Sequence, residues 1–243
     1  MTPAGEGDMS ADTRAERGVA RAGHTCLAHL PIPATNEGSL AHLIAGRRSR
    51  REFGPRPLTG VEIGLLLWAG QGITGPDGGR AAPSAGALYP VTLTLVDARG
   101  VWRYHAREHA LEIACAGDCR SPLAAAAFSQ EFIAKAPITI AVSARPAVLE
   151  PRYAGRAERY CVLEAGHVAQ NVLLMATELG LASVPVGAFD DVAVLPTLKL
   201  GAEHLPLYLL PVGAPLTPRP SRQRQVGEGT DDDGGDPCRS GMP

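Results

Sequence analysis

The chain has 243 residues, which suits one domain with or without tails, and 45% of them are hydrophobic, enough for a sizeable core. The formal net charge of −2 gives no support for nucleic acid or a membrane surface as a partner. No apolar stretch approaches the ~20 residues that span a bilayer, and no signal peptide pattern opens the chain. These properties predict a cytoplasmic protein.

The five cysteines are odd in number and irregularly spaced. Cys115 and Cys119 are separated by three residues, but neither a second cysteine pair nor a histidine pair completes a zinc site. We therefore expect reduced thiols and no bound metal.

The first expected helices follow a leader at residues 1–30, which is rich in Ala, Gly and Arg, shows no periodicity and is expected to be flexible. Residues 40–46 and 60–70 each predict a short helix, and Thr59 is placed to cap the second. Alternating or β-branched runs predict strands at residues 91–97, 101–105, 110–114, 137–142 and 207–212.

Two more helices are expected between and after these strands. Ser121 and Pro122 form a cap and first turn for a helix through residue 127, and Asp190 caps another toward residue 200. Residues 214–243 are rich in Pro and Arg and then acidic, which predicts a flexible tail.

The longest predicted helix covers residues 160–181, which contain no proline and many good helix formers. It is apolar around most of its circumference, which predicts burial, and a row of small residues lets another backbone approach closely. These small residues are Gly166, Ala169, Ala176 and Gly180. A short strand at residues 183–189 follows, and its Pro-Val-Gly turn could present backbone N–H groups to a ligand.

Helices and strands mix here without regular βαβ alternation. This pattern predicts an α+β domain at residues 31–213, with helices packed on a mixed sheet. The sequence GQGITG at residues 70–75 matches the dinucleotide-binding motif literally, but it follows a helix rather than a strand, so we expect no Rossmann site there.

The densest positive cluster, RRSRREF, occupies residues 47–53. Guanidinium groups bind phosphate through two parallel hydrogen bonds, and backbone N–H groups can hold the polar edge of a planar ring. Together with the Ser-Gly loop near residue 84 and the turn near residue 187, the cluster indicates an anionic cofactor. A solvated surface is the alternative interpretation of the arginines.

Four motifs then occur in order: RRSRREF, PSAGALYP, LEAGHVAQN and VPVGAFDD. Together they resemble the nitroreductase superfamily of FMN enzymes, most closely its SagB-type branch, which includes azoline-oxidising dehydrogenases of ribosomal peptide biosynthesis. The resemblance covers roughly residues 30–213. It implies an α+β homodimer with FMN at the interface, and an oxidoreductase that transfers hydride through flavin N5, with NAD(P)H or the substrate as hydride donor.

The resemblance also implies site residues. One segment matches the family's R-x-S-x-[KR] pattern and is expected to contact the FMN phosphate, ribitol and pyrimidine edge; it contains Arg47, Arg48, Ser49 and Arg51. A second segment is expected to reach FMN from the partner subunit, with Pro83, Ser84, Ala85 and Gly86. A turn is expected to direct its amides at N5 and O4, with Val186, Gly187 and Ala188. Candidates for further phosphate contacts are Arg219, Arg222 and Arg224.

Arg152 and Tyr153 occupy the position of a catalytic Lys-Tyr pair in the azoline oxidases of this branch. Lysine can lose its proton and act as a base, whereas arginine effectively cannot, so this departure argues against azoline oxidation. Tyr153 can still donate or accept a proton. Three functions remain open: a general FMN-dependent oxidoreductase, an azoline dehydrogenase that makes thiazole or oxazole, and a non-catalytic FMN-binding scaffold subunit.

Overall fold

The structure is a computed structural model that describes residues 27–29 and 40–216 of the chain. The expected tail from residue 217 onward lies outside the described residues, as do Arg219, Arg222 and Arg224. Residues 27–29 fall inside the predicted leader, yet they form strand β1 (Leu27–His29), which pairs with β4. Three residues are too few for a periodic pattern, so this strand could not be recognised from the sequence.

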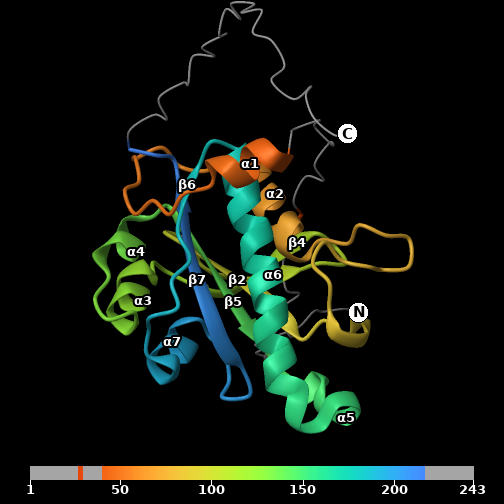
Figure 1. The fold of residues 1–243 in the computed structure, drawn as a ribbon. Helices are drawn as coiled ribbons and strands as arrows, with labels where there is room; N and C mark the ends of the chain where they lie inside the picture. Colours follow the sequence, from red (N-terminus) through yellow and green to blue (C-terminus); the bar gives the residue numbers. More distant parts are fainter. Residues whose placement is uncertain (1–26, 30–39, 217–243) are drawn as a thin grey trace, which may run out of the picture.

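A seven-stranded sheet with the order β1-β4-β3-β2-β5-β7-β6 forms the centre of the molecule (Figure 1). The named strands all pair antiparallel, whereas the sequence predicted a mixed sheet. Parallel pairing is present in the isolated bridge between Ser49 and Ser183. The strands after β1 are β2 (Val91–Asp97), β3 (Gly100–His105), β4 (Ala110–Ala116), β5 (Ile138–Ala144), β6 (Ala182–Ser183) and β7 (Leu205–Gly213).

Helices cover both faces of this sheet, and the α+β prediction is confirmed (Figure 1). They are α1 (Leu40–Gly46), α2 (Gly60–Gln71), α3 (Arg120–Ala126), α4 (Glu131–Lys135), α5 (Glu150–Tyr153), α6 (Ala157–Glu178) and α7 (Asp191–Thr197). All seven residues of β5 are buried. Its residues Ile138, Ile140, Val142 and Ala144 belong to one core cluster, and Ala141 belongs to a second. One cluster includes residues of α2 and α6, and the other includes residues of α3 and α7.

The local signals at the helix ends give mixed results. Thr59 makes the predicted cap of α2, in a capping box with Glu62, and Asp190 caps α7. The predicted cap at Ser121 is wrong, because α3 begins at Arg120 and Cys119 takes the cap position without a side-chain hydrogen bond. The predicted strand at residues 183–189 is reduced to the end of β6 and an isolated bridge at Val186.

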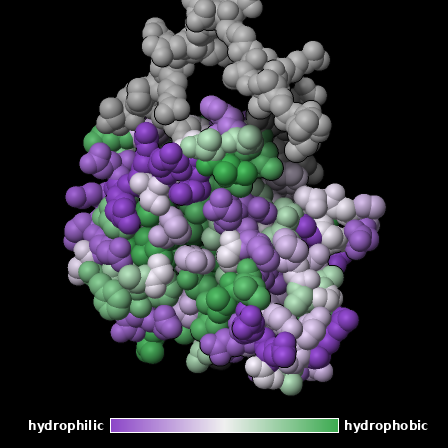
Figure 2. All heavy atoms as spheres, in the orientation of Figure 1, coloured by the Kyte–Doolittle hydropathy of each residue, from purple (hydrophilic) through white to green (hydrophobic). Residues whose placement is uncertain are grey.

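Helix α6 runs along the front of the molecule (Figure 1). Its sequence predicted burial around most of its circumference, but one face of the helix is exposed. It packs closely on α2, since a Cβ added to Gly70 would lie 3.1 Å from Val172. Its outer face exposes about half of Val162 and Leu163 (49% and 50%). Hydrophobic surface is visible over the lower part of this helix (Figure 2).

Candidate functional site

The arginine-rich segment extends the sheet edge beside β6. The amide of Arg50 donates to the carbonyl of Ser183 at 2.9 Å, and Ser49 forms a parallel bridge with Ser183. Farther along, the amide of Gly54 donates to the carbonyl of Ala214 at 2.8 Å. These backbone bonds fix residues 49–54 against β6 and against the residue that follows β7, so the segment lies beside the strand that leads into the turn.

The predicted site residues of this segment lie at the surface. Arg48, Ser49 and Arg51 are exposed and Arg47 is half-buried. The guanidinium of Arg48 folds back and donates to the carbonyls of Ala45 and Arg47, at 3.0 and 2.7 Å. Arg51 extends instead toward α4, where its guanidinium carbon lies 5.7 Å from the centre of the Phe132 ring. Hydrophilic surface gathers over this part of the chain at the upper left of Figure 2.

The turn after β6 offers two backbone amides. The amide of Gly187 and that of Ala188 have no hydrogen-bond acceptor in the described part of the chain, and both residues are exposed. A Cβ added to Gly187 would meet no atom within 4 Å, so open space lies beside this residue. Val186 differs, because it exchanges both of its backbone hydrogen bonds with Leu209, at 2.8 and 2.9 Å. Its amide, predicted to face a ligand, is committed to the sheet.

Two residues of the α3–α4 region complete this first group and were not predicted. The side-chain amide of Gln130 donates to the carbonyls of Ala127 and Ala188, at 2.9 and 2.8 Å, and so fixes the turn. Phe132 places an aromatic ring beside Arg51. Neither residue belongs to a motif, and each meets the site only through the tertiary fold, so the sequence contained no local signal for them.

A second group forms around residues 83–86. Gly86 has a φ of +62°, and a Cβ added there would lie 2.6 Å from a guanidinium nitrogen of Arg152 and 2.8 Å from the hydroxyl of Tyr153. The ring of Tyr153 stands edge-on to that of Tyr160, with centroids 4.9 Å apart. The structure therefore brings the predicted catalytic pair together with the predicted partner-reaching loop, of which Ser84 and Ala85 are half-buried and Pro83 is exposed.

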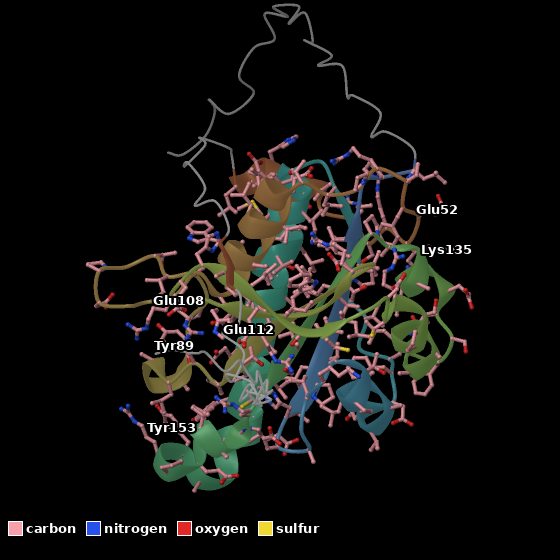
Figure 3. The ribbon with its side chains drawn as sticks, turned by 180° about the vertical axis from the view of Figure 1, so that it is seen from behind. Glu52, Tyr89, Glu108, Glu112, Lys135 and Tyr153 are labelled. Atoms are coloured by element: carbon pink, nitrogen blue, oxygen red, sulfur yellow. The ribbon has the colours of Figure 1, made fainter. Side chains whose placement is uncertain are left out.

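The two groups do not meet within one chain. Tyr153 and Tyr89 lie at one end of the molecule, while Glu52 and Lys135, which flank the first group, lie at the opposite end (Figure 3). Helix α6, with 22 residues, separates α5 from β6 by a length of about 33 Å. Ala85 packs on the core cluster that includes α2 and α6, whereas Val186 belongs to the cluster that includes α3 and α7. A site that uses both groups therefore needs two chains.

The family follows from comparison with known proteins. A sequence model of the nitroreductase family matches residues 44–214, which include both groups. The chain belongs to the nitroreductase family. Members of this family are oxidoreductases that generally use FMN with NAD(P)H and are typically homodimers.

Individual relatives agree with this assignment. A Methanocaldococcus jannaschii protein provisionally named nitroreductase is 39% identical over 191 residues, which cover 76% of this chain and 95% of that protein. A Ralstonia eutropha protein described in the same terms has a solved structure with a TM-score of 0.73 and 26% identity, covering 79% of this chain and 90% of that one.

A chain of an Escherichia coli microcin synthetase complex, McbBCD with truncated pro-MccB17 bound, has the same fold. Its TM-score is 0.60 at 22% identity, with 75% of this chain and 74% of that chain covered.

Other classes of site find no support in the described residues. Among residues 40–216, no three His, Cys, Asp or Glu side chains gather as they would around a metal ion. Within the same range, none of the helices is both long and apolar enough to cross a membrane. Cys115, Cys119 and Cys161 carry free thiols.

Proposed function

We propose that this nitroreductase is an FMN-dependent oxidoreductase of the SagB-type branch and that it works as a homodimer with FMN between the subunits. The observation that carries the proposal is the pairing of the arginine-rich segment with Ser183, which holds a segment containing four arginines beside the strand that leads to the exposed amides of Gly187 and Ala188. An anionic phosphate and the polar edge of a planar ring are the ligand groups that such an arrangement suits.

The residues present fit FMN. Arg47, Arg48 and Arg51 would hold the phosphate and the pyrimidine edge, with the hydroxyl of Ser49 near the ribitol. The amides of Gly187 and Ala188 would face the ring, and the open space beside Gly187 leaves room for it. When bound, FMN supplies hydride transfer at N5. The chain contributes positive charge, which favours the anionic reduced ring, and backbone donors that fix its orientation.

A homodimer is supported by two features of the single chain. The predicted site residues fall into two groups at opposite ends of α6, so a second copy is needed to join them. In addition, α6 exposes Val162 and Leu163 on its outer face beside Gly166, where an added Cβ would meet nothing within 4 Å. An exposed apolar stripe with room for close approach suits the packing of a partner.

Arg152 and Tyr153 would act on the substrate. Arginine keeps its proton at neutral pH, so Arg152 orients or polarises a substrate group and does not act as a base. The hydroxyl of Tyr153 can donate a proton to a reduced product or accept one from a substrate. Both side chains lie beside Gly86, so the loop at residues 83–86 would carry them toward the flavin ring together with itself.

Azoline dehydrogenation of a peptide is the second candidate function. It is favoured by the shared fold with a chain of the McbBCD complex, which has a peptide bound. This reaction requires a base for the substrate proton, and Tyr153 is the member of the pair that can supply one. Turnover of a thiazoline-containing peptide that disappears in Tyr153→Phe would support this candidate, and its absence with every such peptide would favour the first.

The proposed function is tested by titrating flavin-free protein with FMN and following flavin fluorescence. Arg51→Ala should weaken binding by about 1.5–3 kcal/mol, the range for a hydrogen bond to a charged group. Arg107→Ala removes an exposed arginine that belongs to neither group of predicted site residues and should leave the affinity unchanged. Equal affinities of wild type and Arg51→Ala would contradict the assignment, as would a wild-type protein that does not bind FMN.

A further inference from the structure

Helix α4 contacts both parts of the first group of site residues. Its N-cap residue, Gln130, donates from the side-chain amide to the carbonyls of Ala127 and Ala188, at 2.9 and 2.8 Å. Two residues later, the guanidinium carbon of Arg51 lies over the ring of Phe132, 5.7 Å from its centre. This five-residue helix therefore meets the turn that follows β6 as well as the arginine-rich segment.

Contacts outside the arginine-rich segment fix the position of Phe132. The next residue, Ile133, is fully buried, and Phe132 itself packs against the core cluster that includes residues of α3 and α7. The amide of Ala136 donates to the carbonyl of Phe132 at 3.1 Å, and the guanidinium of Arg120 donates to the carbonyl of Ala136 at 3.3 Å. Since the ring is partly buried and its helix is anchored, it presents a fixed surface to Arg51.

Arg51 is held by little else. Within the described part of the chain, its side chain forms no ion pair and no hydrogen bond, and the residue is exposed. Arg47, Arg48 and Arg50 precede it within four positions, and like charges repel one another. A long exposed side chain samples many rotamers unless a contact restricts it. The π face of Phe132 supplies this contact, because it attracts a cation within about 6 Å of its centre.

The kind of contact matters for ligand binding. A carboxylate beside Arg51 would accept hydrogen bonds from the guanidinium and neutralise its charge. A ring face attracts the same charge but offers no oxygen acceptor, so the N–H donors stay available for a phosphate or for the polar edge of a planar ring. Phe132 can therefore restrict the direction of Arg51 without occupying the donors that bind a ligand.

We propose that Phe132 is a positioning residue for Arg51, and that its ring holds the guanidinium where it binds FMN. The inference rests on the proposed function and deepens it, because it makes flavin affinity depend on a residue outside the arginine-rich segment. Ordering one rotamer-rich side chain on binding weakens affinity by about 2- to 10-fold. A guanidinium that is already held against the ring avoids much of this loss.

The test titrates flavin-free protein with FMN and follows flavin fluorescence. Phe132→Leu removes the π face but keeps an apolar side chain, and the FMN dissociation constant should rise about 2- to 10-fold. Phe132→Met also lacks a ring, fills the space with a flexible side chain and should give the same loss. Phe132→Tyr keeps the ring and should bind as tightly as wild type. Phe128→Leu is the matched control, because Phe128 lies in the same α3–α4 connection, is 65% exposed and should leave the affinity unchanged.

A double-mutant cycle with Arg51→Ala separates positioning from packing. If Phe132 acts through Arg51, Phe132→Leu should cause no further loss of FMN affinity once Arg51 is alanine. Urea unfolding of the same proteins without flavin measures their stability, which Phe132→Leu should lower equally in both backgrounds. Equal losses of affinity in both backgrounds would show that Phe132 supports the site by packing alone, and would overturn the inference.

Other outcomes separate the inference from the proposed function. If Arg51→Ala weakens FMN binding but Phe132→Leu and Phe132→Met bind as tightly as wild type or more tightly, the role of Phe132 is refuted and the proposed function stands. If wild type does not bind FMN, or if Arg51→Ala binds it as tightly as wild type, the proposed assignment of the arginine-rich segment is refuted, and the inference with it.

Discussion

Substituting Gly86 by alanine tests how the loop meets the catalytic pair, because Gly180 provides a matched control. Both glycines have nearly the same backbone conformation, with φ of +62° and +67°. A Cβ added to Gly180 would meet nothing within 4 Å, so Gly180→Ala measures only the cost of placing alanine in the left-handed region. That cost is about 1–2 kcal/mol.

At Gly86 the added Cβ would also lie 2.6 Å from a guanidinium nitrogen of Arg152 and 2.8 Å from the hydroxyl of Tyr153. These atoms are the ends of flexible side chains, which can move away at little cost. We therefore expect Gly86→Ala to lose the same ~1–2 kcal/mol as Gly180→Ala, and to displace Arg152 and Tyr153 in addition. For a chain of this size, the loss lowers the unfolding temperature by about 2–8 °C.

The assay is urea unfolding of the two variants and wild type at one protein concentration, followed by turnover of an electron acceptor at equal flavin content. The account predicts equal stability losses but a decrease in turnover that is confined to Gly86→Ala, because the displaced Arg152 no longer orients or polarises the acceptor. A stability loss for Gly86→Ala more than about 1 kcal/mol above that of the control would show that Arg152 and Tyr153 cannot move. An unchanged stability would show that the loop does not adopt the left-handed conformation at Gly86.

Three further predictions concern other parts of the molecule. Thr59→Ala removes the cap of α2 and leaves the backbone amide of Glu62 without its acceptor, so urea unfolding should show a loss of about 1 kcal/mol. Asp97→Ala removes a buried carboxylate that accepts from the Trp102 indole nitrogen at 3.0 Å and from the β2–β3 turn. The free energy of unfolding should fall by about 2–3 kcal/mol, and a fall below about 0.5 kcal/mol would contradict this role. Tyr153→Phe should still reduce a nitroaromatic or quinone, and a loss beyond the ~10²-fold expected for a general acid–base group would show Tyr153 acting in all of the chemistry.

The sequence predicted the elements whose signals are local. The capping box at Thr59 requires only Glu62 three residues later, and the strand at residues 91–97 is marked by its own side chains. The end of α6 at Gly180 is likewise local, because its positive φ is needed for the amide of Leu181 to reach the carbonyl of Ala176 at 2.8 Å.

Features that depend on distant contacts were missed or altered. Gln130 and Phe132 reach the turn at Ala188 and the side chain of Arg51 through the tertiary fold alone. The outer face of α6 was predicted to be buried because Val162 and Leu163 are apolar, but the same pattern arises whether a face is covered by the chain's own core or by a partner. The amide of Val186 was predicted to face a ligand, and its pairing with Leu209 depends on a strand that follows some 20 residues later.

The central claim is that FMN is held by the arginine-rich segment of one subunit and by the loop at residues 83–86 of the other. It is tested most directly by mixing two variants that each bind FMN poorly, Arg47→Ala/Arg51→Ala and Ser84→Asp. In a two-fold symmetric dimer, a heterodimer of these variants has one site with both defects and one intact site.

After unfolding and refolding an equal mixture, tight FMN binding should return to about a quarter of the sites, since random pairing makes about half of the dimers mixed. Refolding each variant alone is the control and should restore none. If both groups served the same site within one chain, every site in the mixture would keep a defect, and the absence of recovered binding would contradict the account.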